Sequence, residues 1–248
     1  MTLNIMRRIY IDSILSSNIK IDARNKLLLN RIKIVLRAKV GDQYRLFNSV
    51  DGEFLAEVTN ITKKEIVFLV KTKLREVEKE PKLEILIPQI KQERLKWLVE
   101  KSTELGVTNI TFFRSTRTQK EAINIDKIIS YAISASEQSE RVNIPEVSFI
   151  DNIYDYLRHN PKCVFVMLNE HEKEKFIDKT IISKSQSYIF GPEGGFDNEE
   201  TQRILLNNNV VSAHLGRRIL RTETAVLFML SAHNLFHFDN VDFPRSYG

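Results

Sequence analysis

The chain has 248 residues (28.9 kDa); 42% are hydrophobic and 28% charged, and the mean hydropathy is −0.25. Those proportions are typical of a globular chain with enough apolar material for one large domain or two ordinary ones. The longest apolar runs are six residues, CVFVML at 163–168 and AVLFML at 225–230. Because a membrane-spanning helix needs about 20, no such helix is expected. The first residues, MTLNIMRRIY, have no apolar run after their charges, so no signal peptide is expected either.

Positive charge is concentrated in the first third of the chain. Residues 1–80 hold 16 Lys and Arg against 10 Asp and Glu, whereas residues 81–248 hold 21 against 22. A basic excess confined to one segment indicates a polyanion-binding module beside a neutral one. The alternative is a solvated basic surface without a partner. The single cysteine, Cys163, cannot form an internal disulfide, which favours a reducing, cytoplasmic compartment and a buried thiol.

The first 70 residues follow a pattern of short strands. Strands are expected at residues 8–11, 43–47, 53–58 and 66–70, and Asp51-Gly52 predicts a hairpin turn. Strands this short and closely spaced predict a small β-barrel over residues 1–72. Residues 73–82 are almost entirely charged and end in Pro81-Lys82, which predicts a linker.

From residue 83 the pattern changes to strands alternating with helices. Strands are expected at 83–87, 107–113, 163–168, 188–190 and 210–215, and helices at 92–105, 126–139, 197–208 and 222–236. This alternation predicts an α/β domain around a mainly parallel sheet over residues 83–248. Asp197 and Glu200 form a capping-box pattern, and Thr222 is the expected N-cap of the last helix.

Three of the eight glycines fall within GPEGGF at 191–196, between a short apolar strand and the helix capped by Asp197. Glycines at the exit of a sheet strand let the backbone approach a ligand closely. A tight turn without a ligand is the alternative. The spacing matches neither a Walker phosphate loop nor a dinucleotide-binding fingerprint.

A second cluster, LGRRILRTETA at 215–225, also follows an expected strand. Two glycine-bearing loops at strand exits can wall one pocket, and Arg217, Arg218 and Arg221 would bring positive charge that suits a phosphate-bearing substrate. The alternative is a basic surface turn. His233 and His237 have the spacing of zinc ligands on a helix, but no third ligand is apparent, so no metal and no covalent nucleophile is predicted.

These two segments resemble the signature of the SPOUT-class 16S rRNA (uracil-N3)-methyltransferases, the RsmE family. Other stretches agree in the same order: VLR at 35–37 with Gly41-Asp42, KSTELGV at 101–107, and SEQSER at 136–141 with IPE at 144–146. The resemblance therefore spans almost the whole chain. The departures are Arg31, where the family often has His, Arg217, where some relatives have Pro, and Ser136 or Ser139, where Cys is more common.

The resemblance implies an α/β protein with an N-terminal PUA-like β-barrel and a C-terminal SPOUT domain that contains a trefoil knot. It implies a cytoplasmic homodimer that uses S-adenosylmethionine to methylate N3 of a specific uridine in 16S rRNA, with the rRNA or the small ribosomal subunit as partner. No membrane and no metal are involved. The implied cofactor-binding residues are Leu168, Asn169, Gly191, Pro192, Glu193, Gly194, Gly195, Leu215, Gly216, Ile219, Leu220, Thr222 and Ala225.

Uracil N3 carries a proton, so such an enzyme must stabilise the uridinate and accept that proton. Arg221 is predicted to stabilise the negative charge, and Glu223 or Glu193 to accept the proton. The alternative for each glutamate is a carboxylate that serves only the N-terminus of a helix. The arginines predicted to contact RNA are Arg7, Arg8, Arg24, Arg31, Arg37 and Arg141.

Two other functions stay open. A SPOUT enzyme could methylate another RNA atom, such as a ribose 2′-OH, which the PUA-like barrel and RTETA at 221–225 disfavour. A non-catalytic RNA-binding or assembly factor is the alternative from another class, which the intact glycines of the cofactor loops disfavour.

Overall fold

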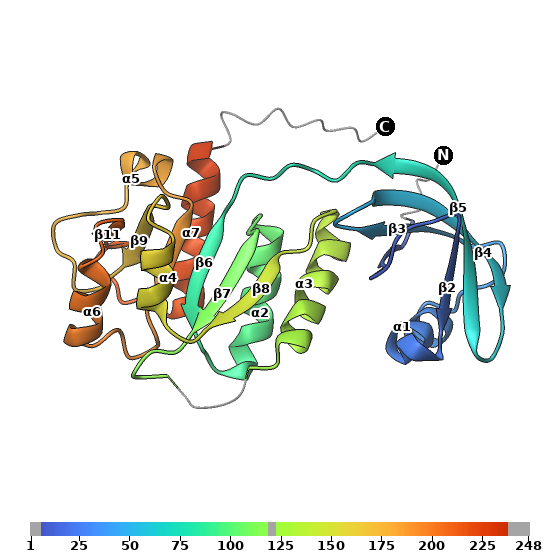
Figure 1. Cartoon of the computed structure of the whole chain (residues 1–248), viewed down its shortest axis with the longest axis horizontal. Helices are drawn as coiled ribbons and strands as arrows, with labels where there is room; N and C mark the ends of the chain where they lie inside the picture. The colour runs from blue at the N-terminus through green and yellow to red at the C-terminus, as the bar shows by residue number, and fades with distance from the viewer. Residues whose placement is uncertain (1–5, 119–122, 238–248) are drawn as a thin grey trace. The chain divides into compact units, whose positions relative to one another are not determined.

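The chain forms two compact units in a computed structural model that describes residues 6–118 and 123–237 (Figure 1). The first unit combines Met1–Lys79 with Ser136–Ile144, and the second combines Glu80–Ala135 with Pro145–Gly248. The short segment 136–144 therefore belongs to the N-terminal unit, although residues of the second unit flank it on both sides.

The first unit contains a barrel-like five-stranded sheet in the order β1-β3-β4-β5-β2. Its strands are β1 (Arg8–Tyr10), β2 (Asn18–Asp22), β3 (Gln43–Asn48), β4 (Gly52–Ile61) and β5 (Glu65–Arg75). β1 pairs with β3 in parallel, and the remaining pairs are antiparallel. The hairpin predicted at Asp51-Gly52 is confirmed: Gly52 has φ +98°, and a Cβ there would lie 2.3 Å from the carbonyl oxygen of Arg75, so only glycine fits.

Strand β5 is longer than the charge pattern predicts. Its last residues, 73–75, lie inside the predicted linker at 73–82, so that boundary is wrong for these three residues. The reason is cross-strand pairing: Arg75 lies opposite Glu53 of β4 and donates from Nε to its Oε2 at 2.6 Å. An ion pair of this kind keeps a charged sequence in a strand, which a count of charges along the chain does not register.

A short helical segment lies between β2 and β3, where the sequence pattern predicts none. It comprises η1 (Ala23–Asn25), α1 (Lys26–Asn30) and the π-helical turn η2 (Arg31–Val35). Over residues 24–35, Leu29 and Ile32 are the buried residues, whereas Leu27, Ile34 and Val35 are exposed. The apolar residues therefore do not mark one face, and the segment shows no helical period. The two buried residues join the core of the unit with Ile9, Leu46, Val58, Ile66 and Phe68.

The second unit is built on a six-stranded, entirely parallel sheet in the order β11-β9-β10-β6-β7-β8, as the α/β pattern predicts. Its strands are β6 (Glu84–Pro88), β7 (Asn109–Phe113), β8 (Glu146–Ile150), β9 (Phe165–Leu168), β10 (Ser187–Phe190) and β11 (Val210–Ala213). Its helices are α2 (Gln92–Glu104), α3 (Ile125–Ser139), α4 (Ile153–His159), α5 (Lys179–Ser183), α6 (Asn198–Leu205) and α7 (Thr222–His237). The last turn of α3 is in the first unit.

Helices cover both faces of this sheet (Figure 1). α4 and α6 pack on one face, where Ile153, Leu157 and Ile204 meet Ile189 of β10. α2 and α7 contact each other on the opposite face. Tyr188, which precedes Ile189 in β10, points toward that face, and its hydroxyl lies 2.8 Å from Nδ1 of His233 on α7. No described helix combines the length and apolar character needed to cross a bilayer.

Three elements of the second unit, β8, α4 and α5, have no counterpart in the sequence prediction. α4 has seven residues and α5 has five, too few to show a helical period. Side-chain caps start both helices: Asn152 accepts from the backbone N–H groups of Tyr154 and Asp155, and Asp178 accepts from that of Ile181. The capping box predicted for α6 is confirmed, since Asp197 and Glu200 each accept a backbone hydrogen bond from the other.

Candidate functional site

Three strands of the second unit end beside one another and create a pocket. β9 ends at Leu168, β10 at Phe190 and β11 at Ala213, and β9 pairs in parallel with both of the others. Because the carboxyl ends of parallel strands meet at one edge, the loops that follow these strands converge there. Residues of all three loops line one open pocket, and the strand ends of an α/β sheet are a common position for small-molecule sites.

Twelve of the thirteen residues predicted to bind a cofactor line this pocket. They come from three loops far apart in sequence: Leu168 and Asn169; Gly191, Pro192, Glu193 and Gly195; and Leu215, Gly216, Ile219, Leu220, Thr222 and Ala225. Gly194 is absent from the lining. The pocket also contains Glu170 and Arg218, which lie in the segments 168–170 and 215–220 that the resemblance implies as pocket loops. Sequence reasoning missed His171, Phe190, Phe196 and His214. Most of these directly adjoin the predicted segments, and this adjacency was the signal available in the sequence.

The two central glycines of the 191–196 loop differ in what surrounds them. Gly195 has φ +67°, and a Cβ there would lie only 2.6 Å from Oε1 of Glu170. At Gly194 the nearest atom to such a Cβ is Cδ of Arg117, at 3.5 Å, which is an ordinary contact. The backbone and the packing therefore require glycine at 195 and tolerate a small side chain at 194.

Thr222 joins two of the pocket loops. It is the first residue of α7, and its hydroxyl donates to the carbonyl of Gly191 at 2.9 Å. The backbone N–H of Ala225 donates to the carbonyl of Arg221. α7 begins at Thr222 itself, so Arg221 is the residue that precedes the helix, and the predicted cap position is wrong by one residue.

An arginine missed by sequence reasoning holds both candidate proton acceptors. Nη1 of Arg94, in the first turn of α2, lies 2.7 Å from Oε1 of Glu193, and its Nε lies 3.5 Å from Oε1 of Glu223. Glu193 lines the pocket, whereas Glu223 and Arg221 stand beside it at the start of α7. The Arg221 side chain is exposed. The three predicted catalytic residues are thus near one rim, with Arg94 between the two carboxylates.

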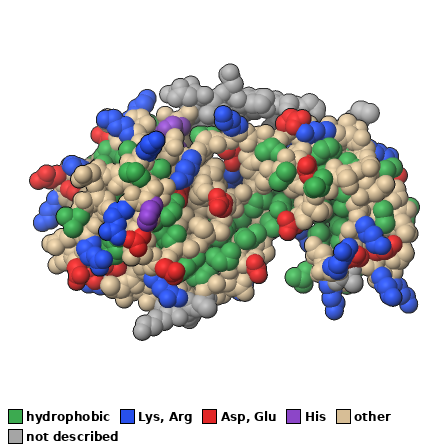
Figure 2. All heavy atoms as spheres, in the orientation of Figure 1, with side chains coloured by type: hydrophobic (Ala, Val, Ile, Leu, Met, Phe, Trp, Pro, Cys, Tyr) green, Lys and Arg blue, Asp and Glu red, His purple; other side chains and the backbone are tan. Residues whose placement is uncertain are grey.

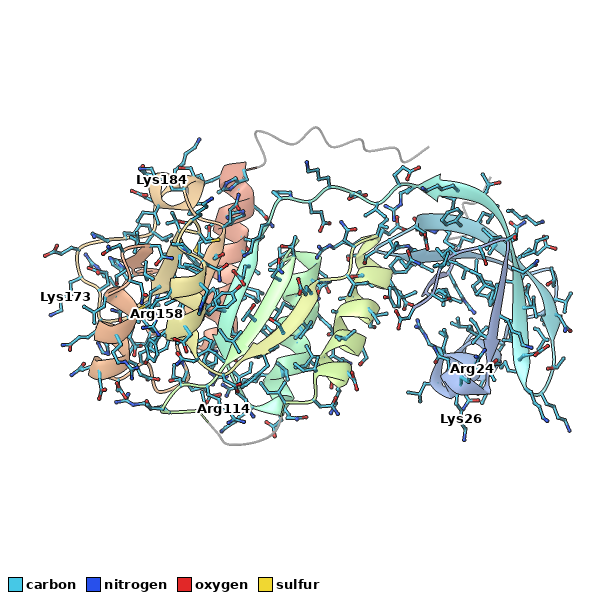
Figure 3. The ribbon with its side chains drawn as sticks, in the orientation of Figure 1. Arg24, Lys26, Arg114, Arg158, Lys173 and Lys184 are labelled. Atoms are coloured by element: carbon cyan, nitrogen blue, oxygen red, sulfur yellow. The ribbon has the colours of Figure 1, made fainter. Side chains whose placement is uncertain are left out.

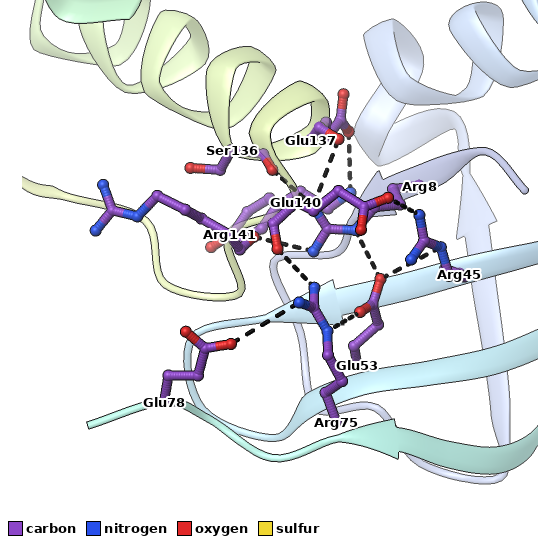
Figure 4. A network of polar contacts seen from close by, with 10 residues as sticks. Arg8, Arg45, Glu53, Arg75, Glu78, Ser136, Glu137, Glu140 and Arg141 are labelled. Atoms are coloured by element: carbon purple, nitrogen blue, oxygen red, sulfur yellow. Dashed lines mark hydrogen bonds and ion pairs between the residues drawn. The ribbon is translucent and has the colours of Figure 1, made fainter. Parts of the chain in front are cut away.

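The arginines predicted to bind RNA lie in the first unit, and one of them is buried there (Figure 4). The Arg8 side chain is 2% exposed; its Nε donates to Glu53 at 2.6 Å, and its Nη1 and Nη2 donate to the carbonyls of Ser136 and Arg141. Burial lowers the pKa of Arg8, while the hydrogen bond that Arg8 donates to Glu53 opposes that effect. Arg8 as an RNA contact is therefore wrong, because water and RNA do not reach it.

The other predicted RNA-binding arginines keep part of their surface. Arg31 pairs with Glu137 at 2.5 Å, and Arg7 donates to the carbonyl of Leu36. Arg24 points outward from η1, although it is paired with Asp22 at 2.9 Å (Figure 3). Arg37 is exposed and has φ +52°, a rare conformation for a residue other than glycine. The backbone carbonyl of Arg141 receives Arg8.

The two histidines of α7, His233 and His237, contact each other and neighbouring side chains of the second unit. His233 is 6% exposed, contacts Tyr188 and stacks against His237 with ring centroids 4.1 Å apart. Burial lowers the pKa of His233 to about 4. Within residues 6–118 and 123–237, no three or more His, Cys, Asp or Glu side chains are placed to hold a metal ion.

Two family models match the chain, one over each part of the sequence. A model described as an RNA methyltransferase domain matches residues 78–234, and one described as an RNA methyltransferase PUA domain matches residues 32–71. Among curated relatives, the ribosomal RNA small subunit methyltransferase E of Rickettsia conorii is 37% identical, over 89% of this chain and 91% of its own length. The protein of the same name from Bacillus subtilis is 31% identical, over 82% and 86%.

Solved structures give the same picture over almost the full length. Ribosomal RNA small subunit methyltransferase E from Neisseria gonorrhoeae, bound to S-adenosyl methionine, is 28% identical with a TM-score of 0.74, covering 93% of this chain and 97% of its own. A methyltransferase from Legionella pneumophila with bound cofactor SAM is 26% identical with a TM-score of 0.79 at the same coverage.

Proposed function

This chain belongs to the RNA methyltransferase family whose domain model spans residues 78–234, and on that basis we propose that it methylates 16S rRNA with S-adenosylmethionine at N3 of one uridine. The observation that carries the proposal is the convergence of residues 168–171, 190–196 and 214–222 on one pocket. The named relatives act on small-subunit ribosomal RNA, and two similar structures hold this cofactor. The uridine and its N3 atom come from the sequence resemblance.

The pocket suits a cofactor that is part apolar and part cationic. Leu168, Phe190, Phe196, Leu215 and Leu220 supply apolar surface for the flat base and the carbon chain of the cofactor. Glu170 supplies a carboxylate, and Nε2 of His171 lies 3.7 Å from its Oε1. Gly195 lets this carboxylate lie against the backbone. When bound there, S-adenosylmethionine supplies an electrophilic methyl group.

The catalytic roles rest on the arginines and glutamates at the rim. We infer that Arg221 stabilises the charge that develops on the uracil, because its side chain is exposed at the start of α7 beside the pocket. Glu193 or Glu223 accepts the N3 proton. Arg94 contacts both carboxylates and thereby fixes the glycine loop relative to the first turn of α7.

The finer architecture is also a proposal. We infer that the first unit is a PUA-like barrel and that the second is a SPOUT domain whose loops form a trefoil knot. The order of β11, β9 and β10 and the hydrogen bond from Thr222 to Gly191 support this proposal, because they bring together the loops that would form the knot. Stretching single molecules from both termini tests it: a knotted chain stops short of its full contour length, and an unknotted one reaches it.

A homodimer follows from the resemblance and from the surface of α2 and α7. Phe228 and Leu235 of α7 are 44% and 65% exposed, and Trp97 of the adjoining α2 is 43% exposed. An apolar surface of this kind is typical of an interface. We propose that it packs against a second copy, in the cytoplasm and without a metal. A monomer at micromolar concentration in analytical ultracentrifugation would contradict this.

The test of the reaction is direct. 16S rRNA from cells that lack this protein is incubated with the pure protein and S-adenosylmethionine, and its nucleosides are resolved by mass spectrometry. We expect one N3-methyluridine per rRNA. A methyl group on a ribose would show that the atom is wrong, and rRNA binding without methyl transfer would show a non-catalytic factor.

A further inference from the structure

The loop that follows β7 is fastened to the start of α6. The Ser115 hydroxyl and the Thr116 backbone N–H donate to the Glu200 carboxylate at 3.1 and 2.8 Å, and the Thr116 hydroxyl lies 2.9 Å from it. Glu200 is 6% exposed. Burying a carboxylate is costly unless hydrogen bonds satisfy it, and this one is satisfied by the loop. Residues 115 and 116 are therefore held in one conformation.

Two arginines flank these anchored residues and point away from the core. Arg114 and Arg117 are both exposed, and Figure 3 shows Arg114 at the surface of this loop. The guanidinium of Arg114 lies over the ring of Phe149, 5.5 Å from its centroid. Nη1 of Arg117 donates to the carbonyl of Gly194 at 2.5 Å. Neither is in an ion pair with a carboxylate in the described part of the chain, in contrast to Arg8, Arg24, Arg31 and Arg94.

The position of the loop connects it to the pocket. β7 is parallel to β6, which pairs with β10, so the loop leaves the sheet at the edge where the pocket lies. Arg117 contacts the 191–196 loop at Gly194, a residue that does not line the pocket. The side chain of Arg117 therefore lies on the outer side of this loop, and the inner side lines the pocket. An RNA strand whose base is brought up to the pocket would run along its rim, to which this loop contributes.

We propose that Arg114 and Arg117 form a phosphate-binding rim that holds the RNA strand next to the base to be methylated. The inference rests on the proposed function, since it takes RNA as the substrate. Guanidinium groups donate several hydrogen bonds in a fixed plane and bind phosphate in preference to other partners. Neither side chain lines the cofactor pocket, so the carboxylate of the cofactor is not their ligand. The anchoring by Glu200 lowers the entropy that the loop would lose on binding.

The experiment measures binding of a full-length 16S rRNA transcript in KCl from 50 to 300 mM. We expect Arg114→Ala with Arg117→Ala to weaken binding at least tenfold, and the slope of log affinity against log salt to flatten by about 0.7 for each lost contact to a single strand. The control is Arg158→Ala, an exposed arginine on α4 paired with Asp155, and it should change neither. Affinity for S-adenosylmethionine, measured by calorimetry, should stay within twofold.

A second variant separates anchoring from charge. Thr116→Val keeps both arginines and removes the hydroxyl contacts to Glu200 and Asp197. We expect weaker RNA binding with an unchanged salt slope, and a circular dichroism spectrum like that of the wild type. The proposal is overturned if the double variant keeps its affinity and slope, or if it loses S-adenosylmethionine while retaining RNA. If the wild-type protein methylates no rRNA, the proposed function fails, whereas the salt series still reports on the rim.

Discussion

Arginine has different uses in the two units. In the first unit Arg8, Arg45 and Arg75 surround Glu53, a carboxylate that is 1% exposed, and Arg75 also donates to the carbonyl of Glu140 (Figure 4). In the second unit Arg114, Arg117 and Arg221 beside the pocket are exposed. Basic and acidic side chains are interspersed on the face that Figure 2 shows. Part of the basic excess of the first unit is therefore used in ion pairs within that unit and is not available to a partner. A charge count locates arginines but does not distinguish these uses.

The largest effect is expected from Glu53→Ala in the first unit. Removing one partner of a buried ion pair leaves Arg8 and Arg75 without their carboxylate, which lowers the free energy of unfolding by about 3–5 kcal/mol. Urea denaturation measures it. Lys71→Ala, which removes an exposed partner of Glu57 in the same sheet, should cost under about 1 kcal/mol. Equal losses for the two variants would refute a structural role for the buried arginines.

Arg221→Ala tests the opposite use of arginine, in the second unit. We expect the single-turnover rate of methylation to fall roughly 10²-fold, the usual loss for one charge-stabilising donor, with little change in stability or RNA affinity. Rapid-quench measurements at saturating RNA report that rate. If RNA affinity falls and the rate does not, Arg221 is a binding contact and its catalytic assignment is wrong.

The two neighbouring glycines sharpen the comparison within the pocket. Gly195→Ala forces a side chain into a left-handed conformation against Glu170, and we expect at least about tenfold weaker binding of S-adenosylmethionine. Gly194→Ala meets only an ordinary contact with Arg117 and should change that affinity by less than about threefold. Calorimetric titration of the two variants under one condition decides it, and similar losses would contradict the geometry.

Acid should act on the units in different pH ranges, with the smallest effects of the four. The pKa of His233 is lowered to about 4 from 6.5, so it stabilises the second unit above pH 6.5 and that stability is lost as the pH falls toward 4. The hydrogen bond from Arg45 lowers the pKa of Glu140 from 4.5, so its contribution to the first unit is lost only below pH 4.5. Trp97, the single tryptophan, reports on the second unit by fluorescence. A urea midpoint that stays constant between pH 6.5 and 5 for this signal would contradict the prediction.

The sequence was most informative where local pattern and function coincide. Alternating strands and helices predicted the parallel sheet, and two glycine-bearing segments predicted two walls of the pocket. Arg94 and the anchoring of Ser115 by Glu200 were not predictable, because each depends on a contact between segments far apart in the chain. The prediction that Arg8 binds RNA was wrong for the same reason. Arg8 begins an expected strand, and its burial depends on Glu53 and on the carbonyls of residues 136 and 141, which are far away in the sequence.

The membership of residues 136–144 in the first unit has a consequence for the order in which the protein is made. When Lys79 has been synthesised, Arg8 and Arg75 already have Glu53, but the carbonyls of Ser136, Glu140 and Arg141 that receive their remaining N–H groups do not yet exist. At about 5–20 residues per second, the missing 65 or so residues take roughly 3–13 s to follow. During that interval the nascent barrel contains two guanidinium groups with unpaired donors. It completes its hydrogen bonding only after most of α3 has been synthesised, so its final folding step depends on translation that continues into the second unit.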